Sequence, residues 1–309
     1  MKVLITGFSG HIGSFFLRKL EKNKKIKKIF LVDNFENNKI NILFSKKKIK
    51  KFNFKFGDLS NKNTLKDIPK VDIAIHLASL TNAVSSINNY KKFYENNFFS
   101  FINIFNYCEK KKVKLIHISS TSVYGSNSKF VDEKCKELNP QSPYAKVKIA
   151  EEKYLKKYGH KIKFVTLRFG TIAGVSEGIR FHTAINKFCF NTSLKIDIPV
   201  WKTALNQYRP YLSLSDAYKA IKAIFEKNIF DRQVYNILSD NFTVNQILNL
   251  IRDEGYRVKV KLTNSRIMNQ LSYKVSKEKF EKKAVKLNAS IKKDIKQTLD
   301  LFKNVNTLR

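Results

Sequence analysis

The sequence predicts an α/β fold in which a doubly wound parallel sheet carries a smaller C-terminal lobe. Three observations support it: a glycine-rich turn near the N-terminus, short apolar runs separated by helical patterns, and acidic or small residues where those runs end. The 309 residues, 43% of them hydrophobic, suffice for one large domain with an added lobe. We expect the large domain over residues 1–170. Residues 171–309 would mainly build the lobe, with segments that return to the large domain.

The first predicted strand, residues 3–5, leads directly into the glycine-rich turn. Gly7, Gly10 and Gly13 follow at intervals of three, and a helical pattern of apolar residues begins after them. Gly7 permits a tight turn, Gly10 lets backbone N–H groups approach a phosphate, and Gly13 lets the helix pack close to the sheet. The positive end of that helix would face the anion. Strand, turn and helix in this order are typical of a Rossmann-type, dinucleotide-binding fold.

The second predicted strand, residues 29–32, ends at Asp33, twenty residues after Gly13. An acidic side chain at about this distance accepts hydrogen bonds from the ribose of an adenosine. The residues that follow are Asn34 and Phe35, so no adjacent cation would pair with a 2′-phosphate. The sequence therefore favours NAD over NADP.

The third and fourth predicted strands, residues 52–56 and 71–77, also end in residues that suit a dinucleotide. The candidates are Asp58 and Leu59 after the third strand and Leu77, Ala78 and Ser79 at the end of the fourth. Asp58 would contact the adenine amine, although an ordinary strand-end turn explains it as well. The small residues would let a cofactor lie across the strand ends. His76, inside an apolar strand, is expected to be buried and hydrogen-bonded rather than catalytic.

Residues 91–110 form a predicted helix that is apolar on most of its circumference. Such a helix must be covered on two sides. We expect the sheet on one side and a second subunit on the other, so that this helix and a helix over 144–158 form the interface of a homodimer. Asn97 is a polar exception on the first of these helices.

The fifth predicted strand, residues 114–119, runs into a serine-rich segment, and the next helix begins with Ser142 as N-cap and Pro143 at its first position. Tyr144 and Lys148 lie one turn apart on one face of that helix. Tyr-x-x-x-Lys recurs elsewhere in this lysine-rich chain, so the spacing proves nothing by itself. Its position after the serine-rich strand end distinguishes Tyr144.

These motifs together resemble the extended short-chain dehydrogenase/reductase family, in particular its NAD-dependent nucleotide-sugar epimerases and dehydratases. The matching pieces are Thr6-Gly7-x-x-Gly10-x-x-Gly13, Asp33, Asp58-Leu59, Leu77-Ala78-Ser79, Asn97, Ser119-Ser120, Val123-Tyr124-Gly125, Tyr144-x-x-x-Lys148, Leu167-Arg168-Phe169-Gly170, Arg209-Pro210-Tyr211 and Ser215-Asp216-Ala217. The resemblance implies that Tyr144 is the catalytic base, Lys148 its electrostatic partner and Ser120 the hydroxyl that bonds the reacting sugar oxygen.

The resemblance also implies the residues that bind cofactor and substrate. The cofactor candidates are Gly7, Gly10, His11, Ile12, Gly13, Asp33, Asn34, Asp58, Leu59, Leu77, Ala78, Ser79, Asn97, Ser119, Tyr144, Lys148 and Gly170. The substrate candidates are Thr121, Thr171, Arg180, Asn186, Arg209 and Arg266. Arg209 would contact a diphosphate, because its planar guanidinium matches phosphate oxygens better than a lysine does. Trp201, nearby in the sequence, is expected to serve packing.

Departures from the family patterns narrow the predicted reaction. Family 4,6-dehydratases carry an Asp-Glu pair directly after the catalytic hydroxyl, and UDP-glucuronate decarboxylases a Glu at the second of these positions. Here they are Thr121 and Ser122. Removal of water needs an acid and a base there, so dehydration is disfavoured. The absence of a Cys at Ser122 disfavours the chemistry that makes GDP-fucose, and Thr171 replaces the substrate-contacting Asn of UDP-galactose 4-epimerases.

The predicted function is an NAD-dependent epimerase that acts on a nucleotide-diphosphate sugar, at C4, through a transient keto-sugar. If the keto-sugar left before reduction, the protein would be a nucleotide-sugar dehydrogenase or reductase, which is the alternative. A non-catalytic dinucleotide sensor or RNA-binding protein is a third possibility. It is less favoured because a pure binder would have no need to keep Ser120, Tyr144 and Lys148 together.

The composition bears on partners and location. A net charge of +35 can mark a nucleic-acid-binding protein. Only nine of the 60 basic residues are arginine, and the lysines are scattered over turns and helix faces, so we expect no nucleic-acid partner. No apolar run is long enough to cross a membrane, and the first strand starts too early for a signal peptide. Three well-separated cysteines fit neither a disulfide framework nor a metal site, so a cytoplasmic protein without a metal is expected.

Overall fold

A computed structural model describes residues 1–36, 40–44, 50–82, 85–125, 130–264 and 273–305. Its central element is a seven-stranded sheet with the order β11-β7-β5-β4-β1-β2-β3, in which every pair is parallel. The strands are β1 (Lys2–Thr6), β2 (Lys28–Asp33), β3 (Phe52–Phe56), β4 (Ile73–His76), β5 (Lys114–Ser120), β7 (Phe164–Phe169) and β11 (Val234–Ile237). The predicted doubly wound α/β fold is confirmed.

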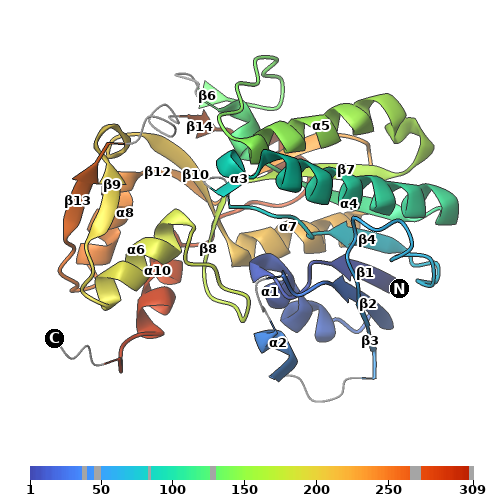
Figure 1. Cartoon of the computed structure of the whole chain (residues 1–309), viewed down its shortest axis with the longest axis horizontal. Coiled ribbons are helices and arrows are strands. Elements are labelled where there is room, and N and C mark those ends of the chain that lie inside the picture. Colours follow the sequence, from blue (N-terminus) through green and yellow to red (C-terminus); the bar gives the residue numbers. More distant parts are fainter. Residues whose placement is uncertain (37–39, 45–49, 83–84, 126–129, 265–272, 306–309) are drawn as a thin grey trace.

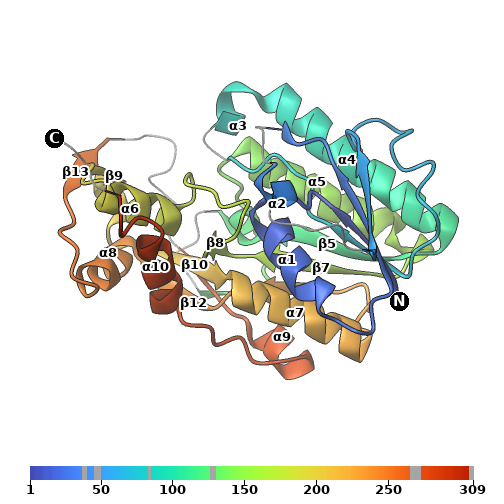
Figure 2. The same cartoon turned by 90° about the horizontal axis from the view of Figure 1, so that it is seen from below.

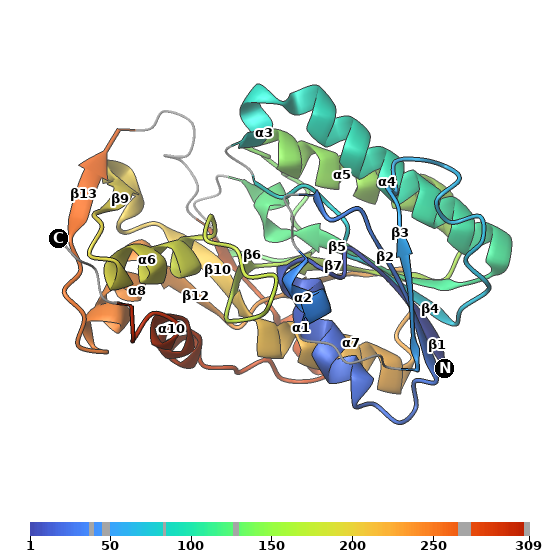
Figure 3. The same ribbon diagram turned by 60° about the horizontal axis from the view of Figure 1, so that its bottom comes forward.

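Helices cover both faces of this sheet, as Figures 1 and 2 show. The long ones are α1 (His11–Glu21), α4 (Tyr90–Lys111), α5 (Pro143–Tyr158) and α7 (Leu214–Lys227). Helices α4 and α5 lie side by side on one face, and α1 and α7 on the other (Figure 3). Val3 and Ile5 of β1 pack on the α1 side, whereas Leu4 packs on the α4 side. Because side chains alternate along a strand, a strand covered on both faces must be apolar throughout.

The chain changes its direction of travel across the sheet between β1 and β4. It adds β2 and β3 on one side of β1 and then returns to place β4 and β5 on the other side. Thr6 and His76 are register partners at the ends of β1 and β4, and the glycine turn and Leu77 follow them. The loops after two such strands separate and leave a crevice, which is where sheets of this kind bind ligands.

A smaller lobe lies beside the sheet, at the left of Figure 1. It holds the three-stranded sheet β12-β10-β8, the strand pair β13-β9 and three helices that share an apolar core. These elements are β8 (Thr171–Ala173), β9 (Ile198–Trp201), β10 (Tyr208–Ser213), β12 (Asp240–Thr243), β13 (Val260–Thr263), α6 (Ala184–Ser193), α8 (Val244–Arg252) and α10 (Ile291–Asp300). Between β10 and β12, the chain returns to the large sheet as α7 and β11.

The remaining elements are short. They are α2 (Asn41–Phe44), α3 (Ser85–Asn88), β6 (Phe130–Val131), β14 (Lys274–Val275), α9 (Glu278–Lys283) and three single turns of 3₁₀ helix at Thr121–Tyr124, Gly159–Lys161 and Lys202–Ala204. Strands β6 and β14 pair in parallel. None of the helices in the described ranges is long and apolar enough to span a bilayer.

Candidate functional site

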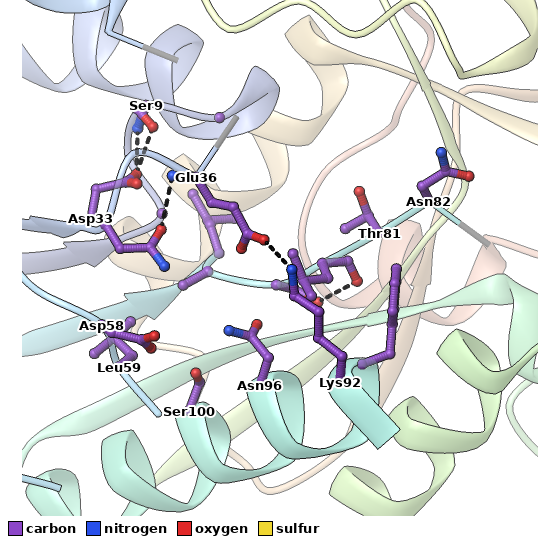
Figure 4. A pocket seen from close by; sticks show the side chains of 18 of the residues that line it. Ser9, Asp33, Glu36, Asp58, Leu59, Thr81, Asn82, Lys92, Asn96 and Ser100 are labelled. Atoms are coloured by element: carbon purple, nitrogen blue, oxygen red, sulfur yellow. Dashed lines mark hydrogen bonds and ion pairs between the residues drawn. The ribbon is translucent and has the colours of Figure 1, made fainter. Parts of the chain in front are cut away.

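A cavity of about 480 Å³ opens where the strands of the large sheet end. Its walls come from the turn after β1, the ends of β2, β3 and β4, and one side of α4 (Figure 4). The predicted cofactor residues in its lining are Gly7, Gly10, Asp33, Asn34, Asp58, Leu59, Leu77, Ala78 and Ser79. Segments that lie far apart in the sequence thus meet at one edge of the sheet.

The glycine turn leaves room for backbone contacts in this cavity. Gly7 has a φ of 70°, and a Cβ there would lie 2.5 Å from the amide nitrogen of Ala78. A Cβ on Gly13 would lie 2.5 Å from the carbonyl oxygen of Gly7, so Gly13 sets how closely α1 approaches the turn. Helix α1 has Gly10 as its N-cap and no side-chain cap. Its first turn therefore suits the binding of a phosphate group.

Asp33 joins the end of β2 to the glycine turn. Its Oδ2 accepts hydrogen bonds from the backbone nitrogen of Ser9 at 2.9 Å and from Ser9 Oγ at 2.8 Å (Figure 4). Its Oδ1 accepts a hydrogen bond from the nitrogen of Phe35 at 2.8 Å. The carboxylate is thus held in one orientation at the wall of the cavity, where it can accept from ribose hydroxyls.

Helix α4 supplies the opposite wall. Asn96 and Ser100 project from it toward the cavity in Figure 4, and Lys92 forms an ion pair with Glu36 at 3.0 Å. None of these four residues was predicted from the sequence. Asn97, expected to support the cofactor site from this helix, does not line the cavity. It exchanges hydrogen bonds of 2.7 and 2.9 Å with the backbone of Leu80 and so holds the segment after β4 in place.

A second cavity, of about 280 Å³, adjoins the first. The two share Leu77, Ser79, Thr81, Asn82, Arg180 and His182 in their linings. The predicted residues that line the second cavity are His11, Ile12, Leu77, Ser79, Ser119, Ser120, Tyr144, Lys148, Gly170, Thr171, Arg180 and Arg209. The predicted catalytic residues therefore open onto the second cavity, and most of the predicted nucleotide residues onto the first.

The start of α5 positions the predicted catalytic residues. Ser142 caps the helix by accepting a hydrogen bond from the nitrogen of Ala145 at 3.2 Å, with a proline at the first position, as the sequence predicted. Tyr144 and Ser120, at the end of β5, line the same cavity, and the Ser120 hydroxyl acts to lower the pKa of Tyr144. One turn further on, the Lys148 Nζ lies 6.0 Å from the centre of the Tyr144 ring. A hydroxyl pair and an ammonium thus meet at the wall of the second cavity.

Burial dominates the electrostatics of Tyr144. Burial raises the pKa of this tyrosine above its ordinary value, and the nearby charge of Lys148 only partly opposes that effect. A tyrosine that acts as a base near neutral pH must lose its proton there, although a free tyrosine has a pKa of about 10. A positive charge on a bound ligand would lower the pKa of Tyr144 further.

His76 is buried, as the sequence predicted. Its Nδ1 lies 2.9 Å from the hydroxyl of Thr6, and only 2% of the residue is exposed. Burial, followed by the charge of Lys148, lowers the pKa of His76 to about 3. The ring is therefore neutral, even though its edge belongs to the lining of the second cavity.

Two arginines in the second cavity have guanidinium nitrogens that lack a hydrogen-bond acceptor in the described ranges. In Arg209 these nitrogens are Nε and Nη2. The guanidinium of Arg209 lies 5.6 Å from the centre of the Trp201 ring. Within the same ranges, Arg180 Nε also lacks a partner, while its Nη1 donates to the hydroxyl of Thr81. Shielded guanidinium nitrogens without acceptors are costly, so both side chains suit an anionic ligand.

Two other predicted substrate residues, Thr121 and Asn186, lie outside both linings. Thr121 donates to the carbonyl of Phe169 at 3.2 Å. Asn186 is fully buried in α6, where its Nδ2 donates to the carbonyl of Arg180 at 3.1 Å. It therefore supports the backbone of an arginine that does line the cavities. Arg266 falls outside the described residues.

The lobe touches the glycine turn through residues 174–180, a contact that the sequence analysis missed. His11 Nε2 lies 2.8 Å from the carbonyl oxygen of Gly174, Ser176 Oγ donates to the carbonyl of His11 at 2.8 Å, and the nitrogen of Gly178 donates to Ser14 Oγ at 3.0 Å. A Cβ at position 178 would lie 2.3 Å from the carbonyl oxygen of Ser9. The only sequence signal was an isolated glycine, which does not reveal what approaches it.

Other lining residues of the second cavity were also missed. They are Ser122, Gln141, His182, Thr183 and Tyr273. No carboxylate lines this cavity within the described part of the chain. In those same ranges, no group of three or more His, Cys, Asp or Glu residues is placed to hold a metal ion.

Comparisons with known proteins agree with this geometry. Residues 3–237 match the family described as the NAD dependent epimerase/dehydratase family. The Methanocaldococcus jannaschii protein named "Putative UDP-glucose 4-epimerase" is 26% identical over 311 residues, which cover 98% of this chain and 99% of that protein. The dTDP-D-glucose 4,6-dehydratase of Dictyostelium discoideum is 31% identical over 259 residues, which cover 77% of this chain and 58% of that protein.

A solved structure shows the same fold over nearly the whole chain. The crystal structure of the Thermus thermophilus UDP-glucose 4-epimerase in complex with NAD superimposes with a TM-score of 0.85 and 21% identity. The match covers 99% of this chain and all of the other. The likeness therefore includes the lobe as well as the large sheet.

Proposed function

The chain belongs to the NAD-dependent epimerase/dehydratase family, and from that premise we propose that it epimerises a nucleotide-diphosphate sugar at C4 through a transient keto-sugar. The observation that carries the proposal is that the hydroxyls of Ser120 and Tyr144 line a cavity that adjoins the first one, and no carboxylate of the described chain lines it. The hydroxyl pair suits proton transfer with a sugar alcohol. The lack of a carboxylate disfavours elimination of water.

NAD is the cofactor, and the first cavity fits it. The pyrophosphate would lie against Gly7 and Gly10, which have no side chains, and against the start of α1, which has no side-chain cap. Asp33 would accept hydrogen bonds from the adenosine ribose, and Asp58 and Leu59 would contact the adenine. When bound, the cofactor would supply a hydride acceptor in its oxidised form and a hydride donor in its reduced form, so that a sugar carbon could be oxidised and then reduced on its other face.

The residues of the second cavity would carry out the proton chemistry. Ser120 orients the reacting sugar hydroxyl, and Tyr144 takes its proton as the carbon is oxidised. Lys148 stabilises the phenolate by its charge. When the carbon is reduced, Tyr144 returns the proton to the sugar oxygen. The enzyme then ends the cycle with its starting charge and no net redox change.

Substrate binding would draw on arginines at the walls of the second cavity. Arg209 has two nitrogens without acceptors in the described chain and would bind the diphosphate. Arg180 lines both cavities and would bind an anionic group near their junction. Thr171, at the start of β8, faces the same space and would contact the sugar.

Epimerisation is favoured over dehydration by the groups that follow Ser120. Ser122 donates from its Oγ to Ser120 Oγ at 2.9 Å, and Thr121 is engaged by a backbone carbonyl of β7. Neither side chain is an acid or base strong enough to remove a proton from carbon and protonate a departing hydroxide. A keto-sugar formed here would therefore be reduced again rather than lose water.

Incubation of the purified protein with NAD⁺ and a panel of UDP-, GDP-, CDP- and dTDP-sugars tests the proposal. We expect product NMR to show a new C4 epimer of one panel sugar, without lasting absorbance at 340 nm. Stoichiometric NADH with a keto-sugar would instead identify a dehydrogenase. NAD binding without turnover of any panel sugar would contradict epimerisation of these sugars. RNA binding that survives Tyr144→Phe would favour a binding protein.

We also propose a homodimer through α4 and α5. Tyr90 and Phe99 of α4 are 48% and 46% exposed, and Tyr94 stacks on Phe98 with ring centres 5.2 Å apart along the same helix. A second copy would cover these rings. Sedimentation equilibrium should give a dimer that Phe99→Glu dissociates, whereas a monomeric parent protein would contradict the proposal.

A further inference from the structure

A buried carboxylate lies directly behind Lys148, and the reaction proposed above does not use it. Glu151, one turn further along α5, is completely buried. Its Oε2 accepts a hydrogen bond from the Lys148 Nζ at 2.8 Å, and Lys148 itself is only 3% exposed. The ammonium that faces Tyr144 is therefore held from behind by a negative charge.

The same carboxylate oxygen has a second partner on the sheet. His117 Nε2 of β5 lies 2.8 Å from Glu151 Oε2, and His117 Nδ1 lies 3.2 Å from the hydroxyl of Thr166 on β7. All three of these side chains are buried. Glu151 Oε1 has no hydrogen-bond partner in the described ranges. One oxygen therefore fixes the position of the ammonium relative to two strands of the sheet.

The neighbouring Glu152 belongs to a different network. Its Oε1 accepts hydrogen bonds from Ser119 Oγ at 2.6 Å and from Arg168 Nε at 2.9 Å. Its Oε2 accepts from Arg168 Nη2 at 2.6 Å. Because this carboxylate is already neutralised by an arginine of β7, it does not hold Lys148. The two adjacent glutamates thus have separate partners.

The surroundings keep both members of the Lys148–Glu151 pair charged. Burial by itself would lower the pKa of Lys148, but Glu151, with smaller contributions from Tyr144 and Glu152, outweighs that effect and the pKa is raised. Burial would likewise raise the pKa of Glu151, but Lys148 and then His117 outweigh it and the pKa is lowered. A buried ion persists when a partner of opposite charge lies in contact with it.

Few other charges face this pair. His76 of β4 is neutral, Tyr144 and Glu152 lie on α5 itself, and Arg180 approaches Tyr144 from the segment after β8. His117 faces Glu151 from β5. The charge of Glu151 is thus the main negative charge in contact with Lys148, and it also acts on Tyr144.

We propose that Glu151 is a positioning residue of the active site, which fixes the Lys148 ammonium in place and sets the pH range in which Tyr144 exchanges its proton. The proposal rests on the proposed function for the role of Tyr144. It adds a residue that the motif Tyr-x-x-x-Lys does not contain.

The sign of the effect follows from electrostatics. A negative charge makes it harder for every neighbouring group to lose a proton, so its removal lowers the pKa of Lys148. It lowers the pKa of Tyr144 as well, as long as Lys148 stays protonated while Tyr144 titrates. A charged neighbour in close contact typically shifts a pKa by about one to three units. Glu151→Gln keeps the shape of the side chain and deletes the charge. Both limbs of the pH–rate profile should therefore move about one unit or more toward lower pH.

The test follows Tyr144 directly by NMR of ¹³Cζ-tyrosine in the NAD⁺-loaded protein without sugar, with its resonance assigned through Tyr144→Phe. In Glu151→Gln we expect the titration of Tyr144 about one pH unit or more below that of the parent protein. An unchanged or higher titration midpoint in a folded variant would overturn the proposal. Glu226→Gln, which deletes the same charge from the half-exposed surface of α7, is the matched control and should shift nothing.

A second variant covers the case in which Glu151→Gln does not fold. Glu151→Asp keeps the charge but withdraws it by one methylene, so a smaller shift in the same direction is expected. If only this variant folds, a downward shift supports the proposal and an unshifted midpoint overturns it. The tyrosine titration needs no turnover. Failure of the parent protein to epimerise any sugar would therefore count against the proposed function alone.

Discussion

The two cavities differ in what builds their walls. The first is formed mainly by the turn and strand ends of the large sheet and by one side of α4, and backbone geometry at Gly7, Gly10 and Ala78 makes the space beside the turn. The second combines the ends of β4, β5 and β7 with side chains from α5, β8, β10 and the segment around residue 180. A dinucleotide can be bound by features that the fold itself creates, whereas a sugar nucleotide needs side chains that several distant segments supply.

The contact between residues 174–180 and the glycine turn links the two halves. Because Gly178 packs against the backbone of Ser9 and Gly10, the start of the lobe and the phosphate-binding turn hold one another in position. Substitutions at Tyr144 or Arg209 should therefore affect one cavity only, whereas Gly178 should affect both.

Tyr144→Phe should separate the two cavities most clearly, because it should abolish most of the turnover and leave NAD binding nearly unchanged. Loss of a general base typically lowers the rate by about 10²- to 10⁴-fold, so we expect turnover near 10³-fold lower by product NMR. NAD affinity should stay within about twofold by calorimetry, since Tyr144 does not line the first cavity. Tyr218→Phe, which has the same spacing to Lys222 on α7, is the control and should keep full activity. Turnover near the parent rate in Tyr144→Phe would show that Tyr144 is not the base.

Arg209→Met should affect only the second cavity. The substitution would remove the two guanidinium nitrogens that lack partners in the described chain. Each would otherwise donate a charge-assisted hydrogen bond to the diphosphate, which contributes about 1.5–3 kcal/mol to binding. The KM for the sugar nucleotide should rise by about 10²- to 10⁴-fold. Arg252→Met, at an exposed position of α8, should change nothing. A loss of NAD affinity without a change in KM would assign Arg209 to the cofactor instead.

Gly178→Ala should disturb both cavities. The new Cβ would lie 2.3 Å from the carbonyl oxygen of Ser9 and push the glycine turn or the lobe aside. We expect NAD affinity to fall by roughly tenfold and the melting temperature to drop, since forced repacking typically costs about 1–3 kcal/mol. Gly255→Ala, where nothing lies within 4 Å, reports the cost of backbone strain alone. Unchanged NAD binding in Gly178→Ala would mean that the two halves are not coupled there.

Lys92→Ala should have the smallest effect. The Lys92–Glu36 pair spans 3.0 Å beside the first cavity, but the lysine side chain is 65% exposed. Exposed ion pairs contribute little, so NAD affinity should change by less than about threefold in calorimetry. A much larger loss would show that this pair closes over the bound cofactor.

Much of the large domain could be predicted from the sequence. Short apolar runs indicated most of the strands, and residues such as Ser142 and Pro143 indicated a helix start, because capping depends on neighbours in the chain. The places of Gly7, Gly10 and Asp33 in the lining of the first cavity could be predicted for a similar reason, because these residues follow or end a strand. The predicted resemblance to nucleotide-sugar epimerases and dehydratases is confirmed by the family match over residues 3–237.

The residues that the sequence did not reveal depend on packing between distant segments. Glu151 is one of many charged residues on lysine-rich helices, and only its complete burial against Lys148 and His117 distinguishes it. Asn186 was expected at the substrate, but in the structure it supports Arg180 from behind. Residues that make contacts of this kind have no fixed spacing in the sequence, so no motif identifies them.

Epimerisation at C4 through a transient keto-sugar is tested most directly with a sugar that the protein converts. The sugar carries deuterium at C4. We predict that the product epimer keeps the deuterium at C4, because the hydrogen leaves and returns within one active site. NMR and mass spectrometry of the product would measure that retention. Loss of the label to solvent or to released NADH, with an inverted product, would contradict epimerisation through a keto-sugar held in the second cavity.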